Sequence, residues 1–180
     1  GYAFANASGR MRPGNGAWEI DVTSEDASGH LIVPYTFPGE VPMVLDLDRL
    51  HFGGSVRSSE GETDPRQLPV IHVDIRDLQF EGRQYGHLQA DLARGTTGMT
   101  LNQFTMKHAA FEAKGRGSWL MREAGAECRL EFEVESTNVL AFMNAMQLGS
   151  LVAGHHGRIS ASLSWPGPPE SSAIERLSGR

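Results

Sequence analysis

The chain has 180 residues and a formal net charge of −6, from 16 basic and 22 acidic residues. No cluster of basic residues stands out, which argues against a nucleic acid as a partner. The single cysteine, Cys128, excludes an intrachain disulfide, and no apolar run is long enough to cross a membrane. Because the chain begins at Gly1 without a methionine, we expect it to be a processed or excised piece of a longer protein.

The first predicted element is a β-hairpin. Apolar and polar residues alternate over residues 18–22, a turn follows at Ser28-Gly29, and alternation resumes over residues 31–37. Pro34 falls inside the second arm and predicts either an edge strand or a break there.

The next feature is a pattern that occurs three times, at residues 45–52, 73–80 and 99–106. Each copy has apolar residues at its first, third, sixth and eighth positions, so the alternation slips by one residue in the middle. A β-bulge absorbs such a slip and keeps both halves of the strand facing the same way. The repetition therefore predicts similar bulged strands, each with one apolar face, added side by side.

Residues 54–69 are rich in Gly, Ser, Glu, Asp and Pro and are almost free of apolar residues. This composition predicts a polar loop or linker, mobile and exposed. It separates an N-terminal β segment, residues 1–53, from a main β segment, residues 70–180, which we expect to form one continuous domain.

Further strands are predicted where alternation is clear, over residues 88–92, 111–119, 128–135 and 158–165. One short helix is predicted near residues 137–148, capped by Ser136 or Thr137 at its start and by Gly149 at its end. The tail, residues 171–177, is a candidate for one or two more helical turns. The fold class is therefore mainly β: an extended, twisted antiparallel sheet that forms a groove or a half-open sandwich.

The candidates for chemistry favour structural roles. Adjacent His155 and His156 lie between glycines without further ligands nearby, which indicates an exposed turn rather than a metal site. His72 and Asp74 share a strand face with Arg76, so cross-strand ion pairing on a solvated face is the simpler interpretation.

Glu131, Glu133 and Glu135 form a row on one strand and predict a solvated face rather than a glycosidase pair. Cys128 occupies an apolar position of a strict alternation and predicts a buried, inert thiol. No phosphate loop, dinucleotide fingerprint or G-x-S-x-G motif is present in the sequence. We therefore expect no enzyme activity, no cofactor and no metal.

The apolar faces remain as the feature with functional content. They form either the water-free core of a sandwich or the floor of a groove that stays open to an apolar ligand. Periodicity does not separate these alternatives, because both place the same residues on one face.

Short motifs in a defined order resemble the YhdP branch of the AsmA-like proteins of the Gram-negative envelope. They are residues 68–69, 73–80, 85–88, 98–101, 115–119, 135–138, 163–167 and 177–179. No single motif is specific, and the order and spacing over nearly the whole chain carry the resemblance.

The resemblance implies a bridge-like lipid transporter, with a long periplasmic β-groove along which phospholipids pass between the inner and outer membranes. It further implies an N-terminal helix, not present here, that anchors the full-length protein to the inner membrane. The expected partners are phospholipid acyl chains and neighbouring repeats of the same protein, with self-association through bare strand edges.

The leading hypothesis is thus a segment of such a groove, and the alternative is a structural or protein-interaction module of the envelope with a closed core. In the leading hypothesis the groove is lined by Leu45, Leu47, Val73, Ile75, Leu88, Leu92, Met99, Leu101, Leu130, Phe132, Val134, Ile159, Leu163 and Trp165.

Overall fold

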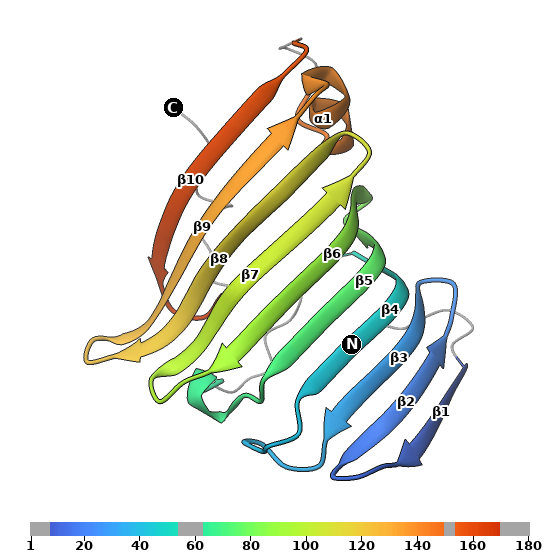
Figure 1. Cartoon of the computed structure of the whole chain (residues 1–180), viewed down its shortest axis with the longest axis vertical. Coiled ribbons are helices and arrows are strands. Elements are labelled where there is room, and N and C mark those ends of the chain that lie inside the picture. The colour runs from blue at the N-terminus through green and yellow to red at the C-terminus, as the bar shows by residue number, and fades with distance from the viewer. Residues whose placement is uncertain (1–7, 54–62, 150–153, 170–180) are drawn as a thin grey trace.

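The computed structural model describes residues 8–53, 63–149 and 154–169. Its strands form a single ten-stranded sheet in which the spatial order equals the chain order (Figure 1). The strands are β1 (Ser8–Pro13), β2 (Ala17–Thr23), β3 (Ala27–Pro34), β4 (Met43–Phe52), β5 (Ile71–Phe80), β6 (Arg83–Arg94), β7 (Gly98–His108), β8 (Phe111–Arg122), β9 (Gly125–Ser136) and β10 (Gly157–Pro166).

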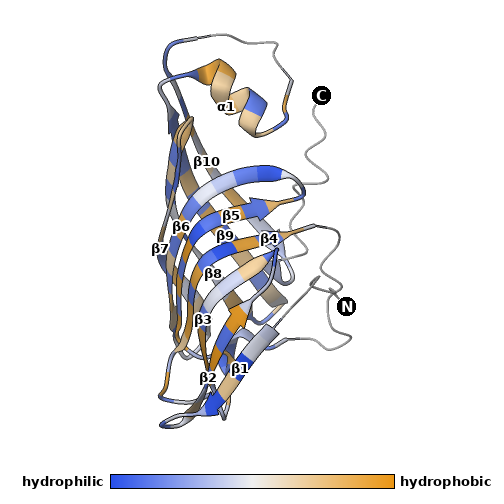
Figure 2. Ribbon diagram, turned by 90° about the vertical axis from the view of Figure 1, so that its right-hand side faces the viewer, coloured by the Kyte–Doolittle hydropathy of each residue, from blue (hydrophilic) through white to orange (hydrophobic). Residues whose placement is uncertain are grey.

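Seen from the side, the sheet is one curved layer, and helix α1 (Val139–Ala145) lies on one side of it (Figure 2). The sheet is not closed into a barrel, so the mainly β fold with one short helix is confirmed. β2 and β3 form the predicted hairpin. Pro34 is the last residue of β3, so it marks the end of that strand, and β3 is not an edge strand.

Neighbouring strands pair antiparallel with one exception, since β4 and β5 are parallel. The expectation of a purely antiparallel sheet is therefore wrong at this joint. Two parallel neighbours need a crossover, because the chain leaves β4 at one end of the sheet and must enter β5 at the other. The described part of this crossover, residues 63–70, contains the 3-10 helix η1 (Pro65–Gln67).

The three predicted bulges are confirmed. An unpaired residue interrupts the ladder at Asp48 in β4 and at Asn102 in β7, and β5 has two residues, Arg76 and Asp77, opposite one residue of β6. Apolar residues remain in register on both sides of the bulge, as the pairs Leu47–Ile75 before it and Leu50–Leu78 after it show.

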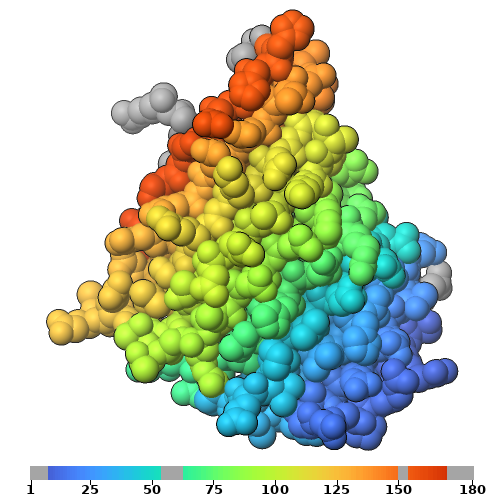
Figure 3. Space-filling view, in the orientation of Figure 1, coloured from blue at the N-terminus to red at the C-terminus, as the bar shows by residue number. Residues whose placement is uncertain are grey.

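The registers align apolar residues into rows that cross the sheet. One row runs through Gly29, Leu47, Ile75, Leu88, Met106, Ala113, Val134 and Ile159. Directly paired residues point to the same side of a sheet, so the sheet has one apolar face and one polar face. The face seen in Figure 3 shows unbroken bands of colour in chain order, so no described segment crosses it.

The helix is shorter than predicted, and its N-cap is Asn138, not Ser136 or Thr137. Ser136 ends β9 instead, where its hydroxyl donates to the carbonyl oxygen of Ala110 at 2.7 Å. The side-chain oxygen of Asn138 accepts from the backbone N–H of Ala141, which is an N-cap contact. The helix predicted over residues 171–177 lies outside the described residues.

The C-terminal part of the segment predicted to be a mobile linker, residues 63–69, is packed against the rest of the protein. Pro65 and Pro69 are the largest fully buried side chains of the described residues. Asp64 caps η1 by accepting from the backbone N–H of Arg66 at 2.9 Å, and it also binds the guanidinium of that residue. Residues 63–69 are therefore a fixed part of the fold, and residues 54–62 lie outside the described ones.

Candidate functional site

The apolar face of the sheet is covered only in part. No second sheet lies over it among the described residues, and the described segments that contact it are α1, the crossover with η1 and the residues that follow β10. Of the residues predicted to line a groove, Leu47, Ile75 and Met99 are buried, at 3%, 4% and 2% exposure. Ile159 is 52% exposed. The others are half-buried: Leu45, Val73, Leu88, Leu92, Leu101, Leu130, Phe132, Val134, Leu163 and Trp165.

One region of this face is closed by its own side chains. Leu47, Ile75 and Leu78, here called the closed cluster, are buried against one another. Half-buried neighbours from the flanking strands pack around them: Val22, Leu31, Leu50, Phe52, Val73, Tyr85 and Leu88. Leu47 and Ile75 are therefore packed against other side chains of the sheet.

A second region of the same face is hollow. A cavity of about 440 Å³, here called the main hollow, opens over β6 to β10. Its lining is dominated by apolar side chains: Leu68, Leu92, Met99, Leu101, Trp119, Cys128, Leu130, Trp165 and Pro169. Of the predicted lining residues, it brings together Leu92, Met99, Leu101, Leu130 and Trp165.

A glycine deepens the floor of the main hollow. Gly117 of β8 lies in register between Leu101 and Leu130, where a larger residue would fill the space. A Cβ atom at this position would approach the carbonyl oxygen of Arg129 to 2.6 Å and the side chain of Leu130 to 3.4 Å. The backbones of β8 and β9 are thus close at this point, and Gly117 adds no side chain to the row between Leu101 and Leu130.

The sides of the main hollow come from two segments that fold back over the sheet. Leu68 belongs to the crossover, between the buried Pro65 and Pro69. Pro169 follows β10, where the indole N–H of Trp165 donates to the carbonyl oxygen of Pro168 at 3.2 Å. These contacts fix the walls, so the hollow is built into the fold and needs no rearrangement to exist.

A smaller hollow of about 230 Å³ lies beside α1. Its apolar lining comes from β9, α1 and β10 and includes Val134, Val139, Phe142, Met143 and Ile159. Phe142 also packs edge-to-face on Phe111, with ring centroids 5.3 Å apart. The helix therefore covers one end of the apolar face without sealing it.

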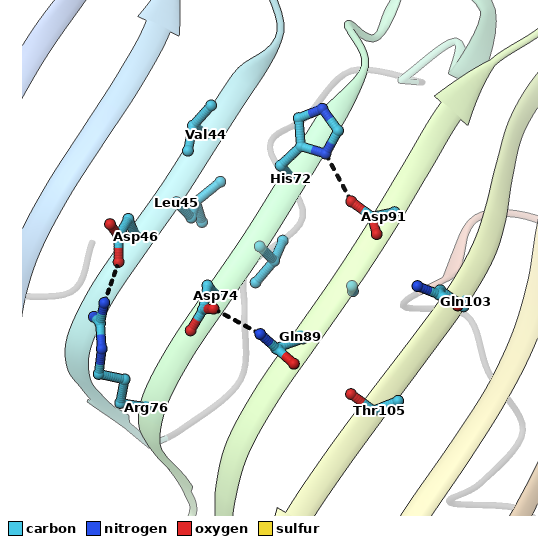
Figure 4. A pocket seen from close by; sticks show the side chains of 12 residues that line it. Val44, Leu45, Asp46, His72, Asp74, Arg76, Gln89, Asp91, Gln103 and Thr105 are labelled. Carbon is cyan, nitrogen blue, oxygen red and sulfur yellow. Dashed lines mark hydrogen bonds and ion pairs between the residues drawn. The ribbon is translucent and has the colours of Figure 1, made fainter.

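Cross-strand polar pairs dominate the opposite face. Around a pocket of about 450 Å³, Arg76 binds Asp46 at 2.9 Å and His72 binds Asp91 at 2.7 Å (Figure 4). Burial raises the pKa of Asp74, but hydrogen bonds from Gln89 and His87 outweigh it and leave that pKa below its ordinary value. The predicted ion pairing on a solvated face is confirmed.

The three glutamates of β9 that were considered as candidates for chemistry also form cross-strand ion pairs. Glu133 is paired with Lys114 at 3.2 Å, and this contact lowers the pKa of that carboxyl group. Glu131 is paired with Arg116, and Glu135 with Arg158.

His155 and His156 are exposed, and Cys128 is 2% exposed, as the sequence predicted. No group of three or more His, Cys, Asp or Glu side chains is arranged to hold a metal in the described part of the chain.

Four apolar residues that line the main hollow were not among the predicted lining residues: Leu68, Trp119, Cys128 and Pro169. Leu68 had a weak signal, as the single leucine within a polar run, and Trp119 continues the alternation of its strand. Pro169 gave no signal, because its position follows from the turn after β10.

A family model described as "YhdP protein" matches residues 1–180, the whole chain. No curated protein and no solved structure is significantly similar to it. Among the described residues, no helix has the length and apolar character that a membrane span requires.

Proposed function

The chain belongs to the YhdP family of envelope proteins, and from this premise we propose that its apolar face shields lipid acyl chains. In this proposal the chain is a segment of a periplasmic β-groove that takes part in phospholipid transport between the inner and outer membranes. The full-length protein is held at the inner membrane by an N-terminal helix outside this chain.

The main hollow carries the proposal. An acyl chain gains about 0.8 kcal/mol for each CH₂ group that leaves water. The hollow offers apolar contacts on its floor, from Leu101 and Leu130, and at its sides, from Leu68 and Trp165. It is also large enough, at about 440 Å³, to lie within the usual range of small-molecule sites.

The character of the floor suits passage as well as binding. Hydrophobic contacts are not directional, so a chain that slides over leucine side chains loses and gains similar contacts at each step. Many charged groups of the sheet are paired with one another across strands on the opposite face. A lipid could therefore bind here with its tail on the apolar face and its headgroup in water.

The proposed role is non-enzymatic and uses no cofactor. A second candidate is a structural or protein-interaction module of the envelope, and the closed cluster of Leu47, Ile75 and Leu78 favours it. The two candidates differ in what occupies the main hollow, which is lipid in the first and nothing in the second.

Native mass spectrometry of the protein purified from a Gram-negative periplasm, followed by lipid extraction, tests the proposal. We expect co-purified phospholipid that is reduced in Leu101→Trp, where the larger side chain fills the main hollow. Thr100→Trp is the matched control, because Thr100 is the preceding residue and is exposed on the opposite face. Lipid-free protein, or equal lipid in both variants, would contradict the proposal.

A further inference from the structure

The floor of the main hollow lies between two rows of residues that pair across β7 to β10. The row at one end, here called the tryptophan row, consists of Met99, Trp119, Cys128 and Trp165. The row at the other end, here called the phenylalanine row, consists of Phe104, Gly115, Phe132 and Ala161. Each end row contains two aromatic residues, so bulky side chains stand at both ends of the floor.

The two ends of the main hollow are closed by different means. At the tryptophan row the backbone folds over the face, because the indole N–H of Trp165 donates to the carbonyl oxygen of Pro168 and Pro169 joins the lining. At the other end the lining stops at Gly117 and Leu130, and the phenylalanine row comes next along β8 and β9. This second end is therefore set by side chains of the sheet itself.

Two glycines of β8 show where the space ends. Gly115 and Gly117 are two residues apart, so they face the same side of the sheet at a distance of about 7 Å. For a Cβ atom placed on Gly117, the nearest side-chain atom would be Cδ1 of Leu130 at 3.4 Å, which leaves the space above open. For a Cβ atom placed on Gly115, it would be Cε1 of Phe104 at only 2.6 Å. The ring of Phe104 thus fills over Gly115 the space that is empty over Gly117.

The ring of Phe104 is supported on the side away from the main hollow. Phe104 packs against the buried cluster of Ala110, Phe111 and Ala113, which Phe142 of α1 covers from above. Ala113 follows Gly115 along the same face of β8, so this cluster lies directly behind the ring. A ligand that advances over Gly117 therefore meets a ring that has packed side chains behind it.

We propose that the ring of Phe104 sets the length of the acyl chain that the main hollow accepts. This inference rests on the proposed function and adds a chain-length preference to it. The tail lies along β8, from the tryptophan row over Gly117, and its end meets Phe104. Each CH₂ group that enters the hollow leaves water, so affinity rises with chain length until the tail reaches the ring. Further CH₂ groups stay in water and add no affinity.

Displacement of a fluorescent fatty acid by saturated fatty acids of increasing length tests this in the intact chain. For the wild type we expect affinity to rise with length and then to level off. Phe104→Ala opens the space over Gly115, so affinity should level off at longer acids, and the longest should bind about tenfold more tightly.

Leu101→Phe makes the opposite change, because it brings a ring to the row of Gly117 as Phe104 does to the row of Gly115. Affinity should then level off at shorter acids than in the wild type. Residues that only stabilise the fold would not move the length limit in opposite directions.

Phe142→Leu is the matched control. It removes a ring that packs against the same buried cluster as Phe104 but lies outside the lining of the main hollow, so the length limit should stay unchanged. Phe104→Leu keeps an apolar side chain against that cluster and replaces Phe104→Ala if the latter does not fold; its length limit should shift in the same direction.

The same length limit in the wild type and the Phe104 variants, or an equal shift in Phe142→Leu, would overturn this inference alone. A wild-type chain that displaces no probe with acids of any length would overturn the proposed function, and the inference with it. Binding at all, and the position of the limit, are separate readouts of one titration, so the two failures are distinguishable.

Discussion

The closed cluster and the main hollow lie on the same face of one sheet and arise from the same alternation of apolar and polar residues. In the closed cluster, Leu47, Ile75 and Leu78 are buried by large side chains from the strands on either side. In the main hollow, the row that contains Leu101 and Leu130 passes through Gly117, which contributes no side chain.

The difference shows that burial on a single-layered sheet depends on the neighbours in each row and on what crosses above it. Around Leu47 and Ile75 the space is filled by large side chains of the same and neighbouring rows, such as Leu88 and Leu31, although this row also begins at a glycine, Gly29. A glycine in the row leaves space, and walls such as Leu68 of the crossover turn that space into a cavity. The region around the closed cluster thus acts as a core, and the region around the main hollow as a candidate ligand site.

The largest effect is expected when a charge enters the closed cluster. Ile75→Asp should cost about 3 to 5 kcal/mol of unfolding free energy, because a carboxylate would replace a side chain that is 4% exposed. Leu101→Asp should cost clearly less, since its side chain faces a cavity, but it should remove bound lipid. Urea unfolding measures both, and equal losses of stability with unchanged lipid would erase the distinction between the regions.

Enlarging the same two side chains gives a sharper comparison. Ile75→Trp should destabilise the protein by about 1 to 3 kcal/mol, because a packed core has no room for the indole. Leu101→Trp has room in the main hollow, so its unfolding free energy should change by less than about 1 kcal/mol. If Leu101→Trp proved as destabilising as Ile75→Trp in thermal and urea unfolding, the cavity would not be open in solution.

Shortening the wall of the main hollow should have a smaller effect. Leu68→Ala removes part of a half-buried side chain of the crossover and should cost about 1 kcal/mol. It should also speed the exchange of a fluorescent fatty acid out of the protein, measured by stopped flow. Gln67→Ala, at the exposed neighbouring position, is the control, and equal exchange rates in the two variants would show that Leu68 does not hold the ligand.

The smallest effect is expected on the polar face. The pKa of Asp74 lies below its ordinary value of 3.8, so its carboxylate stabilises the fold at higher pH. This contribution is lost as the pH falls from the ordinary pKa through the lowered one. Asp74→Asn should therefore reduce stability slightly at neutral pH, with the difference vanishing in acid and lipid content unchanged. A variant that differed most in acid would contradict this sign.

The sequence was most informative where the pattern was local. The one-residue shift of the alternation in each repeated motif predicted the bulges at Asp48, Arg76 and Asn102. A strand with one solvent-exposed face must keep its apolar residues on the other face, and a bulge makes this possible. The parallel joint between β4 and β5 was not predicted, since alternation does not encode strand direction.

The candidate site was predictable only in part for the same reason. The floor residues Leu101 and Leu130 followed from alternation. The walls come from Leu68 and Pro169, in segments without periodicity, and their positions depend on where the crossover and the turn after β10 lead. Whether an apolar face is open or closed is therefore a tertiary property.

The central claim is that lipid occupies the main hollow, and photocrosslinking in the periplasm tests it most directly. A benzophenone amino acid at Leu101 should form lipid adducts on irradiation, detected by mass spectrometry of the purified protein. The same amino acid at Thr100, on the opposite face, should form none. No adduct at Leu101, or equal adducts at both positions, would contradict the account.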